Sequence, residues 1–230
     1  MIASLERLFC SVAEKSARLM FNIDPAWVDR AGHGLVSVAA APRDAHADRR
    51  VSSALQVLYG VRWPSLGALA QRVHRLAVLP SVDVLRVLQA VALYERRGDV
   101  RRCIGRSARA GLGGRVGQPA FDLIVATSGA DASRPGESGP ADTPAAQLAR
   151  DGFRVLEAHG GWTCPDAHRL VSLCFSPDEP AGLFGPAVAA RTAPPAALDA
   201  LIQRLDLLFP EYAWLFGCDM DKALSASPAA

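Results

Sequence analysis

The chain has 230 residues, and half of them are hydrophobic, which is enough to build a sizeable core in one domain. Its 25 basic and 23 acidic residues leave a net charge of only +2, so overall charge gives no case for attraction to nucleic acid or to a membrane surface. The five cysteines are odd in number and contain no Cys-x-x-Cys pair, which indicates reduced thiols in a cytosolic protein. No apolar run approaches the roughly 18 residues of a membrane-spanning helix, and charged residues interrupt the N-terminal apolar positions. We therefore expect neither a signal peptide nor direct membrane insertion.

Hydrophobic periodicity predicts mainly helices in the first third of the chain. Residues 2–20 form an amphipathic pattern, with Leu5, Leu8 and Val12 on the apolar face. Asp24 followed by Pro25 predicts the start of a short helix through Trp27. Residues 31–48 are rich in glycine, alanine and histidine with weak periodicity, which predicts a loop. Further helices are expected over residues 50–58 and 65–77.

Residues 82–125 are the segment around which the rest of the chain is organised. Ser81 is the expected N-cap of a helix that is apolar over most of its circumference, a property typical of a central helix. Gly98 is the expected end of this helix, and Asp99 is expected to cap a short helix through Ile104. The glycine-rich residues 111–117 predict a flexible connection to a second apolar helix ending near Val125.

The second half of the chain alternates between expected loops and helices. Gly, Pro, Ser and Asp dominate residues 127–144, which predict a flexible loop, and five prolines mark 176–195 as another loop. Helices are expected over residues 144–158 and 195–209, with 162–175 mixed or mainly helical and an aromatic turn over 211–216. The sequence thus predicts a mainly α protein: one compact domain over residues 1–220 with about seven to nine helices, long Gly/Pro-rich loops and a disordered tail over 221–230.

No residue pattern in the chain predicts a catalytic, cofactor or metal site. The glycines of residues 111–117 lack the preceding strand that a phosphate-binding loop needs, and no Gly-Lys-Ser/Thr occurs. His159, Cys164, His168 and Cys174 lie near one another in sequence, but their spacings are not those of paired zinc ligands. Cys103 lies beside two arginines that would lower the pKa of an exposed thiol, yet no neighbouring histidine or acid completes a catalytic constellation.

A cluster of arginines is the densest concentration of charge in the chain. Its members are Arg96, Arg97, Arg101, Arg102, Arg106, Arg109 and Arg115. Three interpretations stay open: solvated helix ends, a surface that pairs with carboxylates of a partner protein, and a nucleic-acid contact. Arginine forks match carboxylates well, whereas a nucleic-acid site would want interleaved aromatic residues, and only Tyr94 is nearby. We assign partner binding to Arg97, Arg101, Arg102 and Arg106.

Two sequence motifs carry a resemblance to a known family. Ala92-Leu-Tyr-Glu-Arg-Arg-Gly-Asp-Val-Arg-Arg-Cys-Ile104, followed by Phe121-Asp-Leu-Ile-Val125, resembles the SctK/YscK family of type III secretion, nearest to members from the Hrp systems of plant-associated bacteria. Residues 201–210, followed by Trp214-Leu-Phe216, are similar to the closing helix of that family.

The resemblance implies a helical accessory protein of the cytoplasmic sorting platform, peripheral to the inner membrane, without catalysis or cofactor. It also implies protein partners of the SctD, SctQ and SctL classes. One adhesive face is then expected at the arginines and the other beside the aromatic C-terminal helix. Two alternatives remain: a small cytosolic enzyme with an unrecognised site, and an arginine-dependent nucleic-acid-binding protein.

Overall fold

A computed structural model describes residues 2–39, 45–103, 105–127, 139–177 and 195–225. Every regular element in these ranges is a helix, and the described residues include no strand, so the predicted mainly α class is confirmed. The backbone groups into two compact units. Unit 1 comprises Met1–Val84, Trp162–Pro180 and Cys218–Ala230, and unit 2 comprises Leu85–Gly161 and Ala181–Gly217. The prediction of one domain over residues 1–220 stays a prediction.

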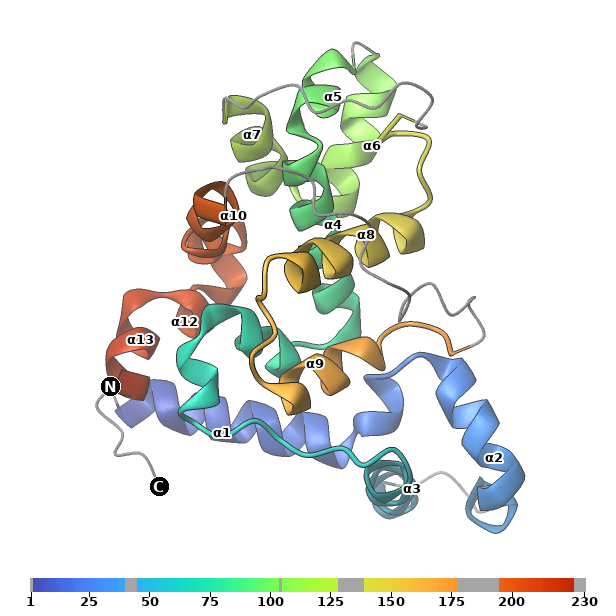
Figure 1. Cartoon of the computed structure of the whole chain (residues 1–230). Helices are drawn as coiled ribbons and strands as arrows, with labels where there is room; N and C mark the ends of the chain where they lie inside the picture. Colours follow the sequence, from blue (N-terminus) through green and yellow to red (C-terminus); the bar gives the residue numbers. More distant parts are fainter. Residues whose placement is uncertain (1, 40–44, 104, 128–138, 178–194, 226–230) are drawn as a thin grey trace. The chain divides into compact units, whose positions relative to one another are not determined.

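Unit 1 contains helices from both ends of the chain and from its middle. These are α1 (Ile2–Ala17), η1 (Leu19–Phe21), α2 (Pro25–Ala39), α3 (Ala45–Leu58), η2 (Ala68–Ala70), η3 (Arg72–Val78), α9 (Pro165–Ser172) and α13 (Cys218–Ser225), where η denotes a 3-10 helix. The first helix, α1, contacts the last, α13, so the two ends of the described chain lie side by side (Figure 1).

Unit 2 is built around α4 (Ser81–Glu95), which starts in unit 1. The other elements are α5 (Arg97–Arg102), α6 (Arg106–Val116), α7 (Gln118–Ala126), α8 (Ala145–Ala158), α10 (Pro195–Ile202), α11 (Leu205–Leu208), η5 (Pro210–Tyr212) and α12 (Ala213–Phe216). Val87, Leu88 and Leu93 of α4 have no accessible surface, which confirms the predicted central helix. Burying each such side chain stabilises the fold by about 1.5–3 kcal/mol.

The core of unit 1 contains charged as well as apolar side chains. All seven residues of η3 are buried, and three of them are basic: Arg72, His74 and Arg75. Lys15 of α1 is buried as well. Because a buried charge is costly unless it is paired and hydrogen-bonded, the partners of these side chains determine how this unit is held together.

Three predictions about helix boundaries are wrong. Residues 31–48 were expected to form a loop, but α2 continues to Ala39 and α3 begins at Ala45, with residues 40–44 outside the described part. The helix expected over 65–77 is instead the pair of 3-10 helices η2 and η3, separated at Gln71 by an extended backbone with ψ 124°. Gly98 does not end a helix, because α5 runs from Arg97 to Arg102 and includes Asp99. Ile104, the expected end of that helix, lies outside the described residues.

Two further predictions about the helices differ from the structure. The expected flexible connection at residues 111–117 is mostly α6, which ends where Gly117 adopts a φ of +91°. The described residues hold thirteen α-helices, more than the seven to nine predicted, partly because the expected 195–209 helix is divided into α10 and α11. The predicted loops fall largely on residues 128–138 and 178–194, outside the described ranges.

The C-terminal residues differ from the expected disordered tail. Helix α13 continues to Ser225, and its Met220, Ala223 and Leu224 are buried. Only residues 226–230 of the expected tail lie outside the described part. The small and polar composition of residues 221–230 concealed Ala223 and Leu224, which lie at helical spacing from Met220. In the described residues, no helix is long and apolar enough to span a bilayer.

Candidate functional site

The predicted arginine surface lies on α5 and α6 of unit 2, and one of its members, Arg101, also holds the end of a neighbouring helix. Arg101 is exposed, and its Nε donates a hydrogen bond to the Val125 carbonyl at 2.9 Å, at the C-terminal end of α7. That contact satisfies a carbonyl that the helix itself leaves unpaired. Arg102 is half-exposed and donates to the Asp99 carboxylate.

Arg97 does not belong to this surface, which corrects its assignment to partner binding. Only 7 % of the residue is accessible. Its Nη1 donates to the Tyr94 carbonyl at 3.0 Å, and its guanidinium lies 4.9 Å from the centroid of the Tyr94 ring. The side chain thus packs its charge over an aromatic face inside the unit. Sequence could not distinguish it from its exposed neighbours, because the corrected start of α5 decides which way it faces.

The remaining exposed arginines form what we call the arginine face: Arg101, Arg102, Arg106 and Arg109. Arg106 is exposed at the start of α6, and Arg109 lies one turn later with its guanidinium 5.9 Å from the Phe121 ring. The other two arginines of the predicted cluster, Arg96 and Arg115, contact Thr143 in the turn before α8. Arg115 donates to the Thr143 carbonyl at 2.7 Å, and Arg96 donates to its hydroxyl at 3.3 Å.

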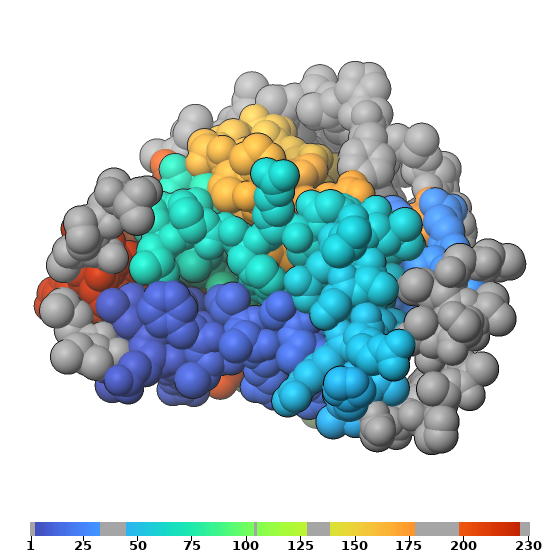
Figure 2. All heavy atoms as spheres, turned by 90° about the horizontal axis from the view of Figure 1, so that it is seen from below, coloured from blue at the N-terminus to red at the C-terminus, as the bar shows by residue number. Residues whose placement is uncertain are grey.

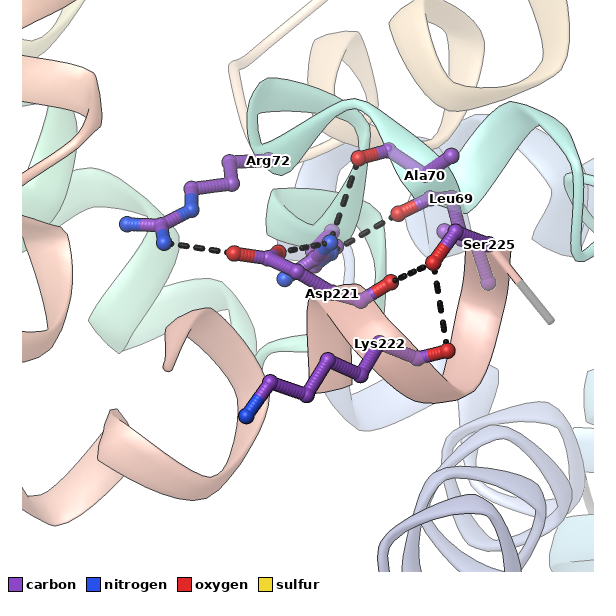
Figure 3. Close-up of polar contacts among 7 residues, drawn as sticks. Leu69, Ala70, Arg72, Asp221, Lys222 and Ser225 are labelled. Atoms are coloured by element: carbon purple, nitrogen blue, oxygen red, sulfur yellow. Dashed lines mark hydrogen bonds and ion pairs between the residues drawn. The ribbon is translucent and has the colours of Figure 1, made fainter. Parts of the chain in front are cut away.

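The strongest polar cluster of unit 1 joins η3 to α13. Arg75 has no accessible surface, and its Nη2 donates to Asp221 Oδ1 at 2.6 Å. Arg72 donates from Nη2 to the other carboxylate oxygen, also at 2.6 Å. Figure 3 shows the carboxylate of Asp221 turned toward the guanidinium group of Arg72. Arg75 is further held by the carbonyls of Leu69 and Ala70, at 2.8 Å and 3.1 Å.

Burial and pairing act in opposite directions on the ionisation of this cluster. Burial raises the pKa of Asp221, but the hydrogen bonds from Arg72 and Arg75 outweigh it and hold the pKa below its usual value of 3.8. Burial lowers the pKa of Arg75, and Asp221 opposes that shift. The carboxylate is therefore ionised at neutral pH, and α13 is attached to η3 by charge-assisted hydrogen bonds, which are stronger than neutral ones.

Lys15 and His74 also belong to the polar interior of unit 1. Lys15 Nζ donates to the carbonyls of Ala77, at 2.8 Å, and Leu79, at the end of η3. Burial lowers its pKa to about 8. The Nε2 of His74 accepts from the Cys164 amide at 3.2 Å, and Nδ1 lies 2.6 Å from the Ala68 carbonyl. This geometry fits a neutral ring that donates from Nδ1.

These buried contacts were not predicted from the sequence. Lys15 is one of only two lysines in the chain, which is the one signal that could have drawn attention to it. His168, which was weighed as a metal ligand, packs edge-on against Trp162, with 5.9 Å between the ring centroids. Within the described ranges, no three histidine, cysteine or acidic side chains converge as metal ligands.

A second exposed surface lies on α1 and α3 of unit 1. Helix α1 contacts α3, and both are visible on the face shown in Figure 2. A groove of about 580 Å³ is lined by Ala13 and Ala17 of α1 and by Ala45 of α3. Exposed apolar side chains accompany these helices: Phe9, Phe21, Val57 and Leu58. The expected aromatic face at the C-terminus is partly internal, because Leu215 and Phe216 of α12 are buried.

Comparison with known protein families gives a match over most of the chain. A family model described as bacterial type III secretion protein (HrpB4) matches residues 3–211. No curated protein and no solved structure matches significantly. The matched residues include Arg72, Arg75 and the arginine face, and they end before Asp221.

Proposed function

We infer the function of the chain from its family: it belongs to the HrpB4 family of bacterial type III secretion proteins. We propose that it is a non-catalytic adaptor of the cytoplasmic sorting platform of the secretion system. In this role it joins a membrane-ring protein of the SctD class to a pod protein of the SctQ class, which in turn carries an SctL-class stalk. The chain is then cytoplasmic and held at the inner membrane through the apparatus.

The family match over residues 3–211 carries this proposal, and the arginine face supports it. Arg101, Arg102, Arg106 and Arg109 are exposed on two consecutive helices. Guanidinium groups recognise carboxylates through paired hydrogen bonds, so the expected partner surface is acidic. Exposed charges of this kind mainly set association rate and specificity.

An adaptor needs a second surface, and the exposed apolar residues of α1 and α3 are our candidate. Phe9 is 54 % exposed and Val57 is 84 % exposed, although both are apolar. Large apolar side chains that stay exposed on contacting helices are candidates for contact with a partner protein. A double change of Phe9→Ser and Val57→Ser is expected to weaken one partner and leave the partner of the arginine face bound.

Binding of purified partners tests the role of the arginine face. We expect Arg102→Glu with Arg106→Glu to raise the Kd for one SctQ- or SctD-class protein by about ten-fold or more. Arg101 is left unchanged because its guanidinium holds the end of α7. The matched control reverses two exposed arginines elsewhere, Arg62→Glu with Arg204→Glu. An equal loss in both variants, or no loss in either, would remove the arginine face from the interface.

A further inference from the structure

The contact between η3 and α13 has the features of a binding site that holds a ligand: η3 supplies the site, and α13 occupies it. Arg72 and Arg75 are buried, yet the carboxylate that pairs with them comes from Asp221, 146 residues beyond Arg75. Helix α13 has eight residues and turns Met220, Ala223 and Leu224 inward. Its other side chains, including Asp219 and Lys222, are exposed.

An eight-residue helix is too short to be stable by itself in water, so α13 is helical because it is bound. Its binding surface consists of α1 and η2 together with the two guanidinium groups. That surface recognises a simple pattern: an acidic residue flanked by an apolar residue one position before it and two apolar residues two and three positions after it. Any short helix that carries this pattern offers the same contacts.

The extent of the family match separates the receptor from its present occupant. Residues 3–211 include both arginines, η2 and all of α1 except Ile2, whereas Asp221 and all of α13 lie beyond them. The chain reaches α13 through Gly217, the last residue of unit 2, where a side chain would lie 2.5 Å from the Ala213 carbonyl. The occupant is thus a short helix that follows a bend at Gly217, the residue after α12.

From these observations we propose that Arg72 and Arg75 form a binding site for a short acidic helix of a partner protein, and that α13 occupies this site in its absence. The partner helix presents its carboxylate between the two guanidinium groups and displaces α13. The partner belongs to the secretion apparatus, so this part of the inference rests on the proposed function. The tethered α13 competes at an effective concentration in the millimolar range, which makes the site selective for well-matched helices.

A labelled peptide of residues 217–225, with Cys218 replaced by serine, tests the site in the full chain. We expect the peptide to bind Asp221→Asn at least about ten-fold more tightly than the wild-type chain, as measured by fluorescence anisotropy, because the tethered competitor is weakened. Leu224→Ala, which leaves the carboxylate in place, is expected to give a gain in the same direction. A peptide with asparagine in place of Asp221 is expected not to bind. Equal affinity of the wild-type and variant chains, or binding of the asparagine peptide, would overturn the proposal.

Two further measurements identify the occupant that replaces α13. Light scattering should find both variants monomeric, since a dimer would show that a second copy's α13 enters the site in place of a partner. An SctQ- or SctD-class protein that uses the site is expected to bind Asp221→Asn more tightly than the wild-type chain. If such proteins bind both chains equally, the partner assignment fails. If they bind neither chain, the adaptor function fails while the peptide result for the site stands.

Discussion

Gly152 of α8 lies directly against the carbonyl of Leu88 in the middle of α4. A Cβ atom built on Gly152 would lie 1.9 Å from that oxygen, so the two helix backbones touch at this point. Both residues are buried. The contact between them depends on the absence of a side chain at Gly152. It joins α4, the central helix of unit 2, to α8, whose sequence is strongly amphipathic.

Gly152→Ala is therefore expected to destabilise the protein by about 3 kcal/mol or more, because α8 must move away from α4 and lose packing. Urea unfolding followed by circular dichroism measures the change. Gly111→Ala is the matched control, since Gly111 lies in α6 with nothing within 4 Å of its added Cβ. That change is expected to stabilise by about 0.5–1 kcal/mol. Similar effects from the two substitutions would contradict the close packing at Gly152.

Asp221→Asn is expected to reduce stability by about 3 kcal/mol, because two buried guanidinium groups lose their charged partner. Asp219→Asn, two residues earlier and exposed, is expected to change it by less than about 0.5 kcal/mol. The lowered pKa of Asp221 sets the pH dependence. Its contribution is present above the ordinary value of 3.8 and is lost as the pH falls through the lowered value, so the wild type and the variant should converge only in acid. A constant difference down to pH 2 would contradict the ion pair.

The lowered pKa of Lys15 predicts that the free energy of unfolding rises as the pH increases above neutral. Its pKa is about 8 in the folded chain and 10.5 when unfolded, so the unfolded state binds more protons between these values. Stability from this group is lost as the pH falls through 8, and the free energy of unfolding should gain about 1 kcal/mol between pH 8 and 9. Above pH 9 the Cys174 thiol acts in the opposite direction, because burial raises its pKa to about 11.

The two lysines of the chain give a matched pair for this measurement. Lys15→Met should abolish the rise in unfolding free energy between pH 8 and 9, whereas Lys222→Met, at an exposed position, should retain it. Denaturant titrations at closely spaced pH values provide the comparison. An unchanged slope in Lys15→Met would show that the buried amine does not titrate in this range.

Substitutions of Arg97 and of the arginine face are expected to have different effects, the first on stability and the second on partner affinity. Arg97→Ala should cost about 1–2 kcal/mol of stability, through the lost contact with the Tyr94 ring and carbonyl, and leave partner affinity unchanged. Arg102→Glu with Arg106→Glu should have its main effect on affinity. Thermal melts together with binding curves of both variants check this separation. Weaker binding by a fully folded Arg97→Ala protein would return Arg97 to the interface.

The apolar pattern of the sequence predicted those helices whose apolar residues repeat at helical spacing. The start of α4 and the start of α8 after Pro144 agree with the structure, because a continuous apolar stripe or a proline marks each of them. Helix α6 was missed because glycine lowers helix propensity, and tertiary packing overrides that preference at Gly113, whose added Cβ would lie 2.9 Å from Gln118.

Local sequence patterns could not predict the polar interior of unit 1. Arg72 and Arg75 resemble surface residues in sequence, and their burial depends on a carboxylate far along the chain. Asp221 in turn belongs to a segment whose composition predicts a frayed tail. The burial of the two arginines and the role of Asp221 each depend on the other, so spacing and periodicity in the sequence could not identify this cluster. The arginine face was found from charge density, while the inward direction of Arg97 required the observed start of α5.

Affinity purification of the tagged chain from a bacterium that makes the secretion system, read by mass spectrometry, tests the adaptor role most directly. We predict recovery of SctQ-class and SctD-class proteins with the wild-type chain, with SctL-class protein carried through SctQ. The Arg102→Glu and Arg106→Glu double variant is predicted to lose one of the first two and to retain the other. Recovery of none of these proteins, in cells shown to assemble the apparatus, would contradict a role in the sorting platform.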